Sequence, residues 1–150
     1  MSEKVKRYEF EISGEPVAKA RPRAAKTKSG QVYMYTPKNT RDFEYMIRKR
    51  AEQVFKKPLQ CPLSLTVIFL MPRPKYLTWK TKPMPMVPAP RQPDIDNCIK
   101  SVTDAMIGVA YADDNQITIL HAYKRYHAGG EGPKTTIIVE EDILEKEVSK

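Results

Sequence analysis

Three aspartates are the residues of this chain best suited to chemistry. Asp94 and Asp96 lie two residues apart in the segment Pro93-Asp-Ile-Asp-Asn-Cys-Ile-Lys100, and Asp114 follows later in the chain. If a helix begins between the first two and a later loop folds back, all three carboxylates can converge, and such oxygen ligands suit Mg²⁺. A bound divalent ion would polarise a phosphodiester and help to generate the attacking hydroxide. The pattern indicates catalytic, metal-binding roles for Asp94, Asp96 and Asp114.

Lys100 is the basic residue best placed to assist them. It lies four residues after Asp96, so both share one face of the expected helix, and its charge would stabilise a transferring phosphate. The alternative is structural: Asp94 or Asp96 caps the helix, and Asp96, Lys100 and Asp104 form a solvated stripe of ion pairs. A DxD string is common, and Asp113-Asp114 alone is more typical of a loop, so both interpretations stay open.

Two helices and a set of strands are expected to position these residues. Hydrophobic periodicity predicts a helix from Asp94 or Ile95 to Ile107, closed by Gly108, and another from Asn39 to Lys56 after Thr36-Pro37. Their predicted buried residues are Phe43, Met46, Ile47, Val54 and Phe55 in one helix and Ile95, Cys98, Ile99, Val102 and Met106 in the other. Strands are predicted at 8–12, 32–35, 63–71, 117–126 and 134–141.

These elements predict an α+β fold: one small domain over residues 1–150, with a mixed or antiparallel sheet and two main helices. The strands 117–126 and 134–141 are expected to pair as an antiparallel hairpin through the turn 128–133. The apolar strand 63–71 is expected to be covered on both faces. Residues 72–93 hold seven of the 13 prolines, which predicts an irregular segment, either an ordered loop or a mobile flap. Residues 140–150 form an acidic tail.

The charge of the chain indicates a polyanionic partner, with nucleic acid ahead of an anionic membrane or an acidic protein. The net charge is +8, and residues 1–100 carry 21 Lys/Arg against 9 Asp/Glu. Two acid-free stretches are predicted to hold the nucleic-acid contacts: Lys19, Arg21, Arg23, Lys26 and Lys28 in one, and Arg73, Lys75 and Arg91, with Lys80 and Lys82, in the other. Tyr33 and Tyr35 could stack on unpaired bases, although strand packing is the simpler interpretation.

Other classes of protein fit the sequence poorly. There is no GxSxG, P-loop or HExxH motif, and of the two histidines His121 is expected to be a packing residue. The first residues lack the apolar stretch of a signal peptide, and no run is long enough to span a bilayer. Cys61 and Cys98 form no CxxC pair, which favours reduced thiols in a cytoplasmic protein.

An ordered set of motifs resembles the RusA family of Holliday junction resolvases. The set is Gly14-Glu-Pro16, Lys19-Ala-Arg21-Pro22-Arg23, Tyr35-Thr-Pro37, Pro93-Asp-Ile-Asp-Asn97, Lys100, Asp104-Ala105 and Asp113-Asp114-Asn-Gln-Ile117. The resemblance covers roughly residues 8 to 140. It implies a homodimeric α+β nuclease that resolves four-way DNA junctions by paired, symmetric incisions with Mg²⁺ or Mn²⁺.

Position by position, the resemblance places the family's metal-binding aspartates on Asp94, Asp96 and Asp114, its catalytic lysine on Lys100, and its basic motif on Lys19–Arg23. The chain departs from the family at Gln92 and Cys98, and its segment 72–93 is longer. The loop before Asp114 is about one residue shorter, so Asp113 and Asp114 could exchange roles. Two alternatives remain: a non-catalytic nucleic-acid-binding module, and a metal nuclease for flaps or other branched DNA.

Overall fold

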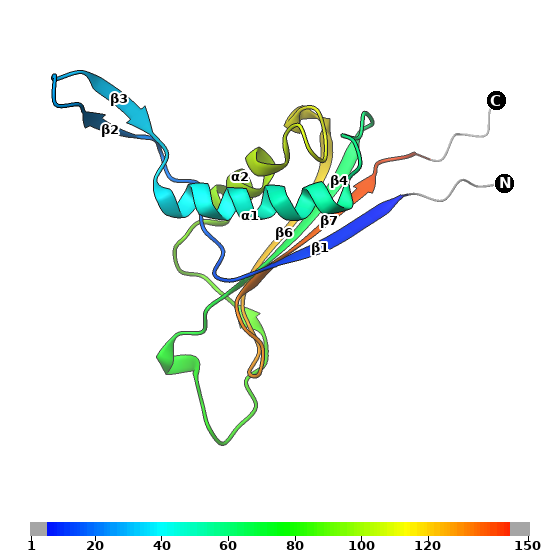
Figure 1. The fold of residues 1–150 in the computed structure, drawn as a ribbon. Helices are drawn as coiled ribbons and strands as arrows, with labels where there is room; N and C mark the ends of the chain where they lie inside the picture. Colours follow the sequence, from blue (N-terminus) through cyan, green and yellow to red (C-terminus); the bar gives the residue numbers. More distant parts are fainter. Residues whose placement is uncertain (1–5, 145–150) are drawn as a thin grey trace, which may run out of the picture.

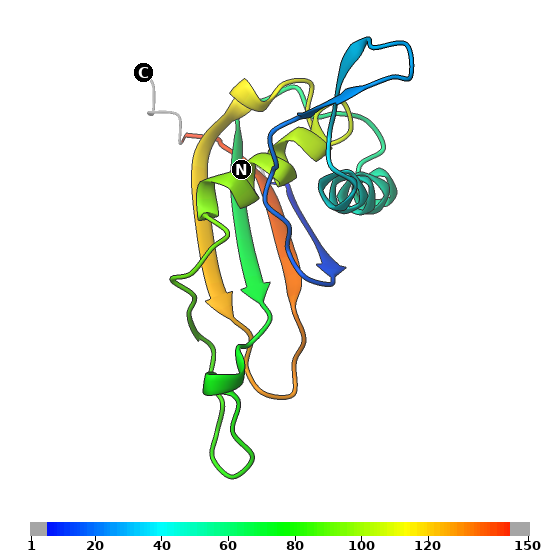
Figure 2. The same ribbon diagram turned by 90° about the vertical axis from the view of Figure 1, so that its left-hand side faces the viewer.

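A mixed β-sheet with two helices on one of its faces forms the body of the molecule (Figures 1 and 2). A computed structural model describes residues 6–144, so positions 145–150 of the predicted acidic tail lie outside the described residues. The regular elements are β1 (Arg7–Ser13), β2 (Arg23–Lys26), β3 (Val32–Tyr35), α1 (Lys38–Val54), β4 (Leu63–Met71), β5 (Val87–Pro88), α2 (Ile95–Met106), β6 (Ile117–Tyr126) and β7 (Lys134–Glu141), with 3₁₀ turns η1 (Lys75–Leu77) and η2 (Asp114–Gln116). The predicted α+β class is confirmed.

The order of strands in the main sheet is β1-β7-β4-β6-β5. β4 pairs antiparallel with β7 and parallel with β6, so the predicted β6–β7 hairpin is wrong. The connection between β6 and β7 passes the end of β4, where the His127 amide donates to the Met71 carbonyl at 3.2 Å. β4 is the most apolar strand, and a central place pairs both of its edges and protects them from water.

The core lies between the sheet and the two helices. Alternate residues of β4 point into it, together with one face of each helix. Its buried members include Leu63, Leu65, Val67 and Phe69 from β4, Phe43, Ile47 and Ala51 from α1, and Cys98, Val102 and Met106 from α2. Two predicted core residues are exposed instead, Met46 by 46% and Ile95 by 37%, because they fall at the edges of the buried helical faces.

No helix of residues 6–144 covers the other face of the sheet (Figure 2). The intervening residues of β4, Ser64, Thr66 and Ile68, are only partly buried, so the strand is not covered on both faces as predicted. Their parallel neighbours in β6 include His121, which is exposed rather than packed. No helix among residues 6–144 has the length and apolarity needed to cross a bilayer.

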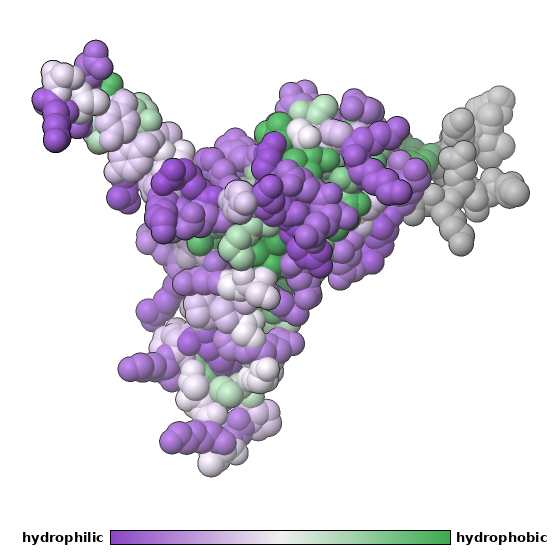
Figure 3. Space-filling view, viewed as in Figure 1, coloured by the Kyte–Doolittle hydropathy of each residue, from purple (hydrophilic) through white to green (hydrophobic). Residues whose placement is uncertain are grey.

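Two projections extend from the body, the hairpin β2–β3 and the proline-rich arm formed by residues 72–93 (Figures 1 and 3). The arm is irregular except for η1 and the two-residue strand β5, which pairs with β6. The guanidinium of Arg73 holds it in place by donating to the carbonyls of Leu77, Pro85 and His127. These three hydrogen bonds favour the ordered loop of the two predicted forms.

Candidate active site

The first turn of α2 presents two carboxylates that the fold does not use. Asp94 occupies the N-cap position, but its side chain makes no capping hydrogen bond. The Asp96 carboxylate accepts only from the neighbouring Asn97 amide, at 3.0 Å, and both aspartates are exposed. Within residues 6–144 neither forms an ion pair. The proposed capping role is therefore wrong for this helix, and both carboxylates are available to a ligand.

An open hollow of about 570 Å³ lies beside these carboxylates. Asp94 and Asp96 line it from α2, and Lys124 and Arg125 line it from β6. Acidic and basic side chains thus meet in one concave surface. Carboxylates that can bind a cation, next to a basic residue such as Arg125 that can bind a phosphate oxygen, suit a metal-assisted phosphodiester site.

Lys124 shapes the segment that leads into α2. Its ammonium donates to the backbone carbonyls of Arg91 and Pro93, just before the first aspartate. Burial raises the pKa of the neighbouring Cys98 thiol to about 11; the charge of Lys124 lowers it, and the charges of Asp94 and Asp96 raise it. Sequence reasoning missed Lys124. The signal was its place in the core-facing alternation of β6, where a lysine needs polar partners.

The loop that carries Asp113 and Asp114 folds back against the helix layer. The buried Tyr111 hydroxyl donates to the Thr103 carbonyl of α2 at 2.6 Å. The Gln116 amide group donates to the carbonyls of Leu59 and Cys61 at 2.8 and 3.0 Å. These contacts hold the loop against the later part of α2, near Thr103, whereas the prediction needed it to return to the first turn of the helix.

Asp113 and Asp114 have different surroundings. Asp113 caps η2: its carboxylate accepts from the Asn115 amide at 3.3 Å, and Gln116 completes a capping box. Asp114 makes no such contact, and a hydrogen bond with Asp113 is the main cause that raises its pKa, followed by burial and the charge of Asp113. The charge of Lys100 opposes this rise in the pKa of Asp114. The expectation that Asp114 is the ligand of the pair stays a prediction, and the capping role of Asp113 supports it.

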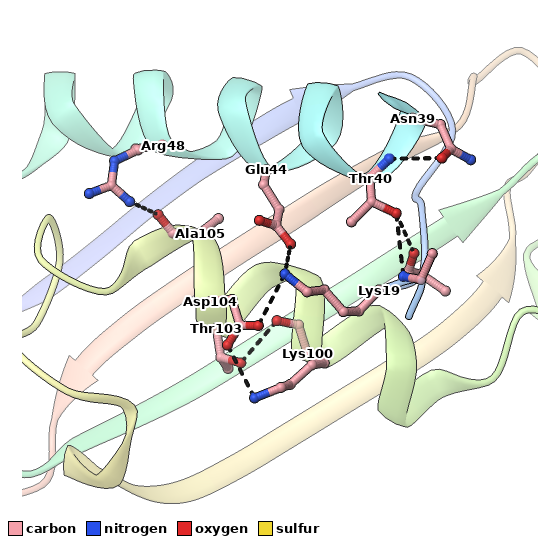
Figure 4. Close-up of polar contacts among 11 residues, drawn as sticks. Lys19, Asn39, Thr40, Glu44, Arg48, Lys100, Thr103, Asp104 and Ala105 are labelled. Atoms are coloured by element: carbon pink, nitrogen blue, oxygen red, sulfur yellow. Dashed lines mark hydrogen bonds and ion pairs between the residues drawn. The ribbon is translucent and has the colours of Figure 1, made fainter. Parts of the chain in front are cut away.

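A chain of ion pairs crosses from the root of the hairpin to α2 (Figure 4). The Lys19 ammonium lies 2.6 Å from Glu44 and 3.3 Å from Asp104, and Lys100 lies 3.2 Å from the other oxygen of Asp104. Burial lowers the pKa of Lys19, but Glu44 and then Asp104 outweigh it, so the net shift is upward. Only the Lys100–Asp104 half of the predicted stripe is formed, since Asp96 makes no ion pair within the described chain.

Two of the predicted DNA contacts have structural partners. Lys19 is partly buried and pairs with two carboxylates. Arg73 donates to the backbone carbonyls of Leu77 and Pro85 in the proline-rich arm and of His127 after β6. Both assignments to DNA stay predictions, and these internal partners weigh against them. The remaining predicted contacts are exposed: Arg21, Arg23, Lys26 and Lys28 in and next to the hairpin, and Lys75 and Arg91 on the arm.

The predicted convergence of three aspartates is not present. Within residues 6–144, no group of three or more acidic, histidine or cysteine side chains is arranged to hold a metal ion. Asp94 and Asp96 line the hollow, whereas Asp114 is not among its lining residues. Two carboxylates still fit Mg²⁺, which binds through one or two of them and completes its shell with waters and substrate phosphates.

Comparisons with known proteins agree with this geometry. The family model described as Endodeoxyribonuclease RusA matches residues 13–140. The uncharacterized protein YqaN of Bacillus subtilis (strain 168) is 30% identical over 138 residues, which cover 88% of this chain and 94% of that protein. The crossover junction endodeoxyribonuclease rusA of Lactococcus phage r1t is 27% identical over 122 residues, covering 78% and 86%. The chain belongs to the RusA family of endodeoxyribonucleases.

Proposed function

We propose that this protein is a Mg²⁺-dependent endodeoxyribonuclease that resolves four-way DNA junctions by paired, symmetric incisions in recombination and repair. One observation carries the proposal: Asp94 and Asp96 offer unpaired carboxylates beside Lys124 and Arg125, in a chain of an endodeoxyribonuclease family. The phage relative is named for crossover junctions, and that substrate comes to this chain as part of the proposal. A cytoplasmic location is included in it.

Each residue has a defined task in the proposed reaction. Asp94 and Asp96 would hold Mg²⁺, or Mn²⁺ in its place, with Asp114 as the predicted third ligand. The metal, when bound, supplies a Lewis acid that polarises the phosphodiester and lowers the pKa of water. Arg125 would bind the phosphate from the other side of the hollow, and Lys100 would stabilise charge on the scissile phosphate. The Lys100 side chain is 56% exposed, so it can turn from Asp104 toward DNA.

The uncovered sheet face supports a homodimer. Ile119 and Tyr123 project from β6 on this face and are 38% and 41% exposed, and Ile68 and Ile138 beside them are half-buried. Exposed apolar groups of this kind favour association. A second copy related by a two-fold axis would cover this face and supply the second active site that paired cuts need.

A labelled four-way junction tests the proposal directly. We expect nicks at symmetric positions in two opposed strands with Mg²⁺ or Mn²⁺ and none with EDTA, and a sedimentation mass of two chains. Binding without cleavage at any metal concentration would instead identify a non-catalytic nucleic-acid-binding module. Faster cleavage of flaps than of junctions would identify a nuclease for other branched DNA.

A further inference from the structure

The hairpin β2–β3 carries an exposed apolar cluster. Val32, Tyr33, Met34 and Tyr35 are 63%, 49%, 63% and 40% exposed. The two strands pair only with each other, and the hairpin extends clear of the body (Figure 3). Neither ring is buried in the core formed by residues 6–144, which weighs against the interpretation of both tyrosines as strand-packing residues. A two-stranded ribbon of this kind is marginally stable alone, so its apolar residues call for a partner.

The register of the hairpin separates two faces. Arg23 pairs with Tyr35 and Ala25 with Tyr33, so one face presents two aromatic rings beside a guanidinium. The ring centroids lie 6.2 Å apart, and the small side chain of Ala25 leaves the rings accessible. Aromatic rings next to a cation form the kind of platform on which nucleic-acid bases stack while their phosphates are held.

The charge around the hairpin selects the kind of partner. Residues 16–41 contain 7 Lys/Arg and no Asp/Glu. A polyanion is attracted to such a segment, whereas the same hairpin of a second copy is repelled by it. Charge complementarity therefore favours DNA over self-association as the partner of the aromatic face.

The root of the hairpin is fixed to the candidate active site. The Lys19 amide donates to the Asn97 carbonyl in the first turn of α2 at 2.8 Å, and the Ala20 amide donates to the Thr40 hydroxyl at 3.3 Å. The Lys19 ammonium adds its ion pairs with Glu44 and Asp104 (Figure 4). DNA held in the hollow thus lies next to the point from which the hairpin extends.

We propose that Tyr33 and Tyr35 stack on unpaired base faces at the branch point of the DNA, while Arg23 holds the adjacent phosphate. The inference rests on the proposed action on branched DNA. In a continuous duplex each base face is covered by its neighbour, whereas a branch point exposes faces for stacking. Phosphate contacts hold any DNA, so the hairpin supplies preference for a branch.

The test compares three variants in EDTA, where no strand is cut. Tyr33→Leu/Tyr35→Leu removes both rings, Tyr33→Phe/Tyr35→Phe keeps them, and Tyr45→Leu removes a tyrosine that is 60% exposed on α1. Each is titrated with a four-way junction and with a linear duplex of the same arm sequence. A 2-aminopurine base at the branch, or in the middle of an arm, reports stacking by its fluorescence.

We expect the leucine pair to weaken junction binding by about ten-fold or more and duplex binding by much less. It should also abolish the fluorescence change at the branch, while the phenylalanine pair and Tyr45→Leu behave as wild type. Equal losses on junction and duplex, or a leucine pair that keeps the wild-type preference, would overturn the inference. A change in sedimentation mass for the leucine pair would overturn it in favour of a second copy. If the wild-type protein binds junction and duplex equally, the proposed substrate is wrong and the inference falls with it. If the wild-type protein prefers the junction and the leucine pair keeps that preference, only the inference is wrong.

Discussion

Two acidic groups lie along α2, and they differ in what the fold does with them. The first-turn pair, Asp94 and Asp96, has no ion-pair partner within residues 6–144. The second group, called the loop group here, is Asp104 near the end of α2 with Asp113 and Asp114 in the loop after it. Asp104 pairs with Lys19 and Lys100, and Asp113 caps η2. In a ligand site the carboxylates have no partner within the protein, because the metal and the substrate supply the positive charge and the remaining contacts. The loop group is instead organised by the protein itself.

The difference has an electrostatic origin. The first-turn pair is exposed, so water solvates both charges, and their mutual repulsion favours a bound cation. The Asp104 side chain is only 21% exposed, and a carboxylate at that depth needs the two ammonium groups that flank it. Asp114 belongs to the loop group by position, but within residues 6–144 it forms no ion pair, and Asp113 rather than Asp114 caps η2. It is therefore the member of that group that stays available to a metal.

The largest expected effect is at the first-turn pair. Asp94→Asn or Asp96→Asn removes a proposed ligand, so junction cleavage should fall to background. DNA binding should hold or increase, because a charge that repels phosphate is lost. Asp94 makes no capping bond, so its free energy of unfolding should change by less than about 0.5 kcal/mol. Cleavage at the wild-type rate in either variant would remove that residue from the site.

Asp113 and Asp114 test which member of the loop group acts with the first-turn pair. Asp114→Asn should reduce cleavage as steeply as Asp94→Asn. Asp113→Asn keeps a side-chain oxygen that can cap η2, so its cleavage loss should be milder. Single-turnover rates on bound junction rank the two variants. The reverse ranking would assign the ligand to Asp113 and show that the shorter loop has shifted it by one position.

Lys100 lies between the two groups, and its substitution tests whether it serves chemistry or structure. Lys100→Met should lower the single-turnover rate by roughly 10²-fold or more if the ammonium stabilises the transition state. Methionine keeps the apolar stem and the helix propensity, so junction affinity and melting temperature should change little. As a surface ion pair with Asp104, Lys100 would contribute at most about 1 kcal/mol to stability. A near-normal rate would therefore assign it to structure.

The elements were predictable where their signals are local. Hydrophobic periodicity and Gly108, whose φ is +85°, located α2, and alternation located β6 and β7. The pairing of strands is not local. Adjacent strands joined by a short glycine-rich connection favoured a β6–β7 hairpin, but β4 competes for the same edges and is more apolar.

The same distinction applies to the candidate site. Asp94 and Asp96 were predictable as a pair because one helical turn joins them. The place of Asp114 depends on bonds from Gln116 to Leu59 and Cys61, which are more than fifty residues away in sequence. The ion pairs of Lys19 were equally hidden, since its partners come from two helices. The distribution of charge along the sequence predicted a basic surface. Only the packed structure shows which of these basic side chains pair with carboxylates and which are exposed.

The smallest expected effect on DNA binding is at a basic side chain that is already paired within the fold, and exposed arginines provide the comparison. Lys19→Met leaves the partly buried Glu44 without its cation and Asp104 with Lys100 alone, so it should lower the free energy of unfolding by roughly 1–3 kcal/mol. The slope of log affinity against log salt should stay as in wild type.

Replacing Arg21 and Arg23 together by methionine should lower this slope and leave the free energy of unfolding unchanged. Stability should hold, because both side chains are exposed, and the slope should fall by up to roughly two units as two phosphate contacts are lost. Titrations at several salt concentrations beside melting curves measure both quantities. A lower slope for Lys19→Met would show that Lys19 contacts DNA. The loop group, whose Asp104 pairs with Lys19, would then lie at the DNA interface as well.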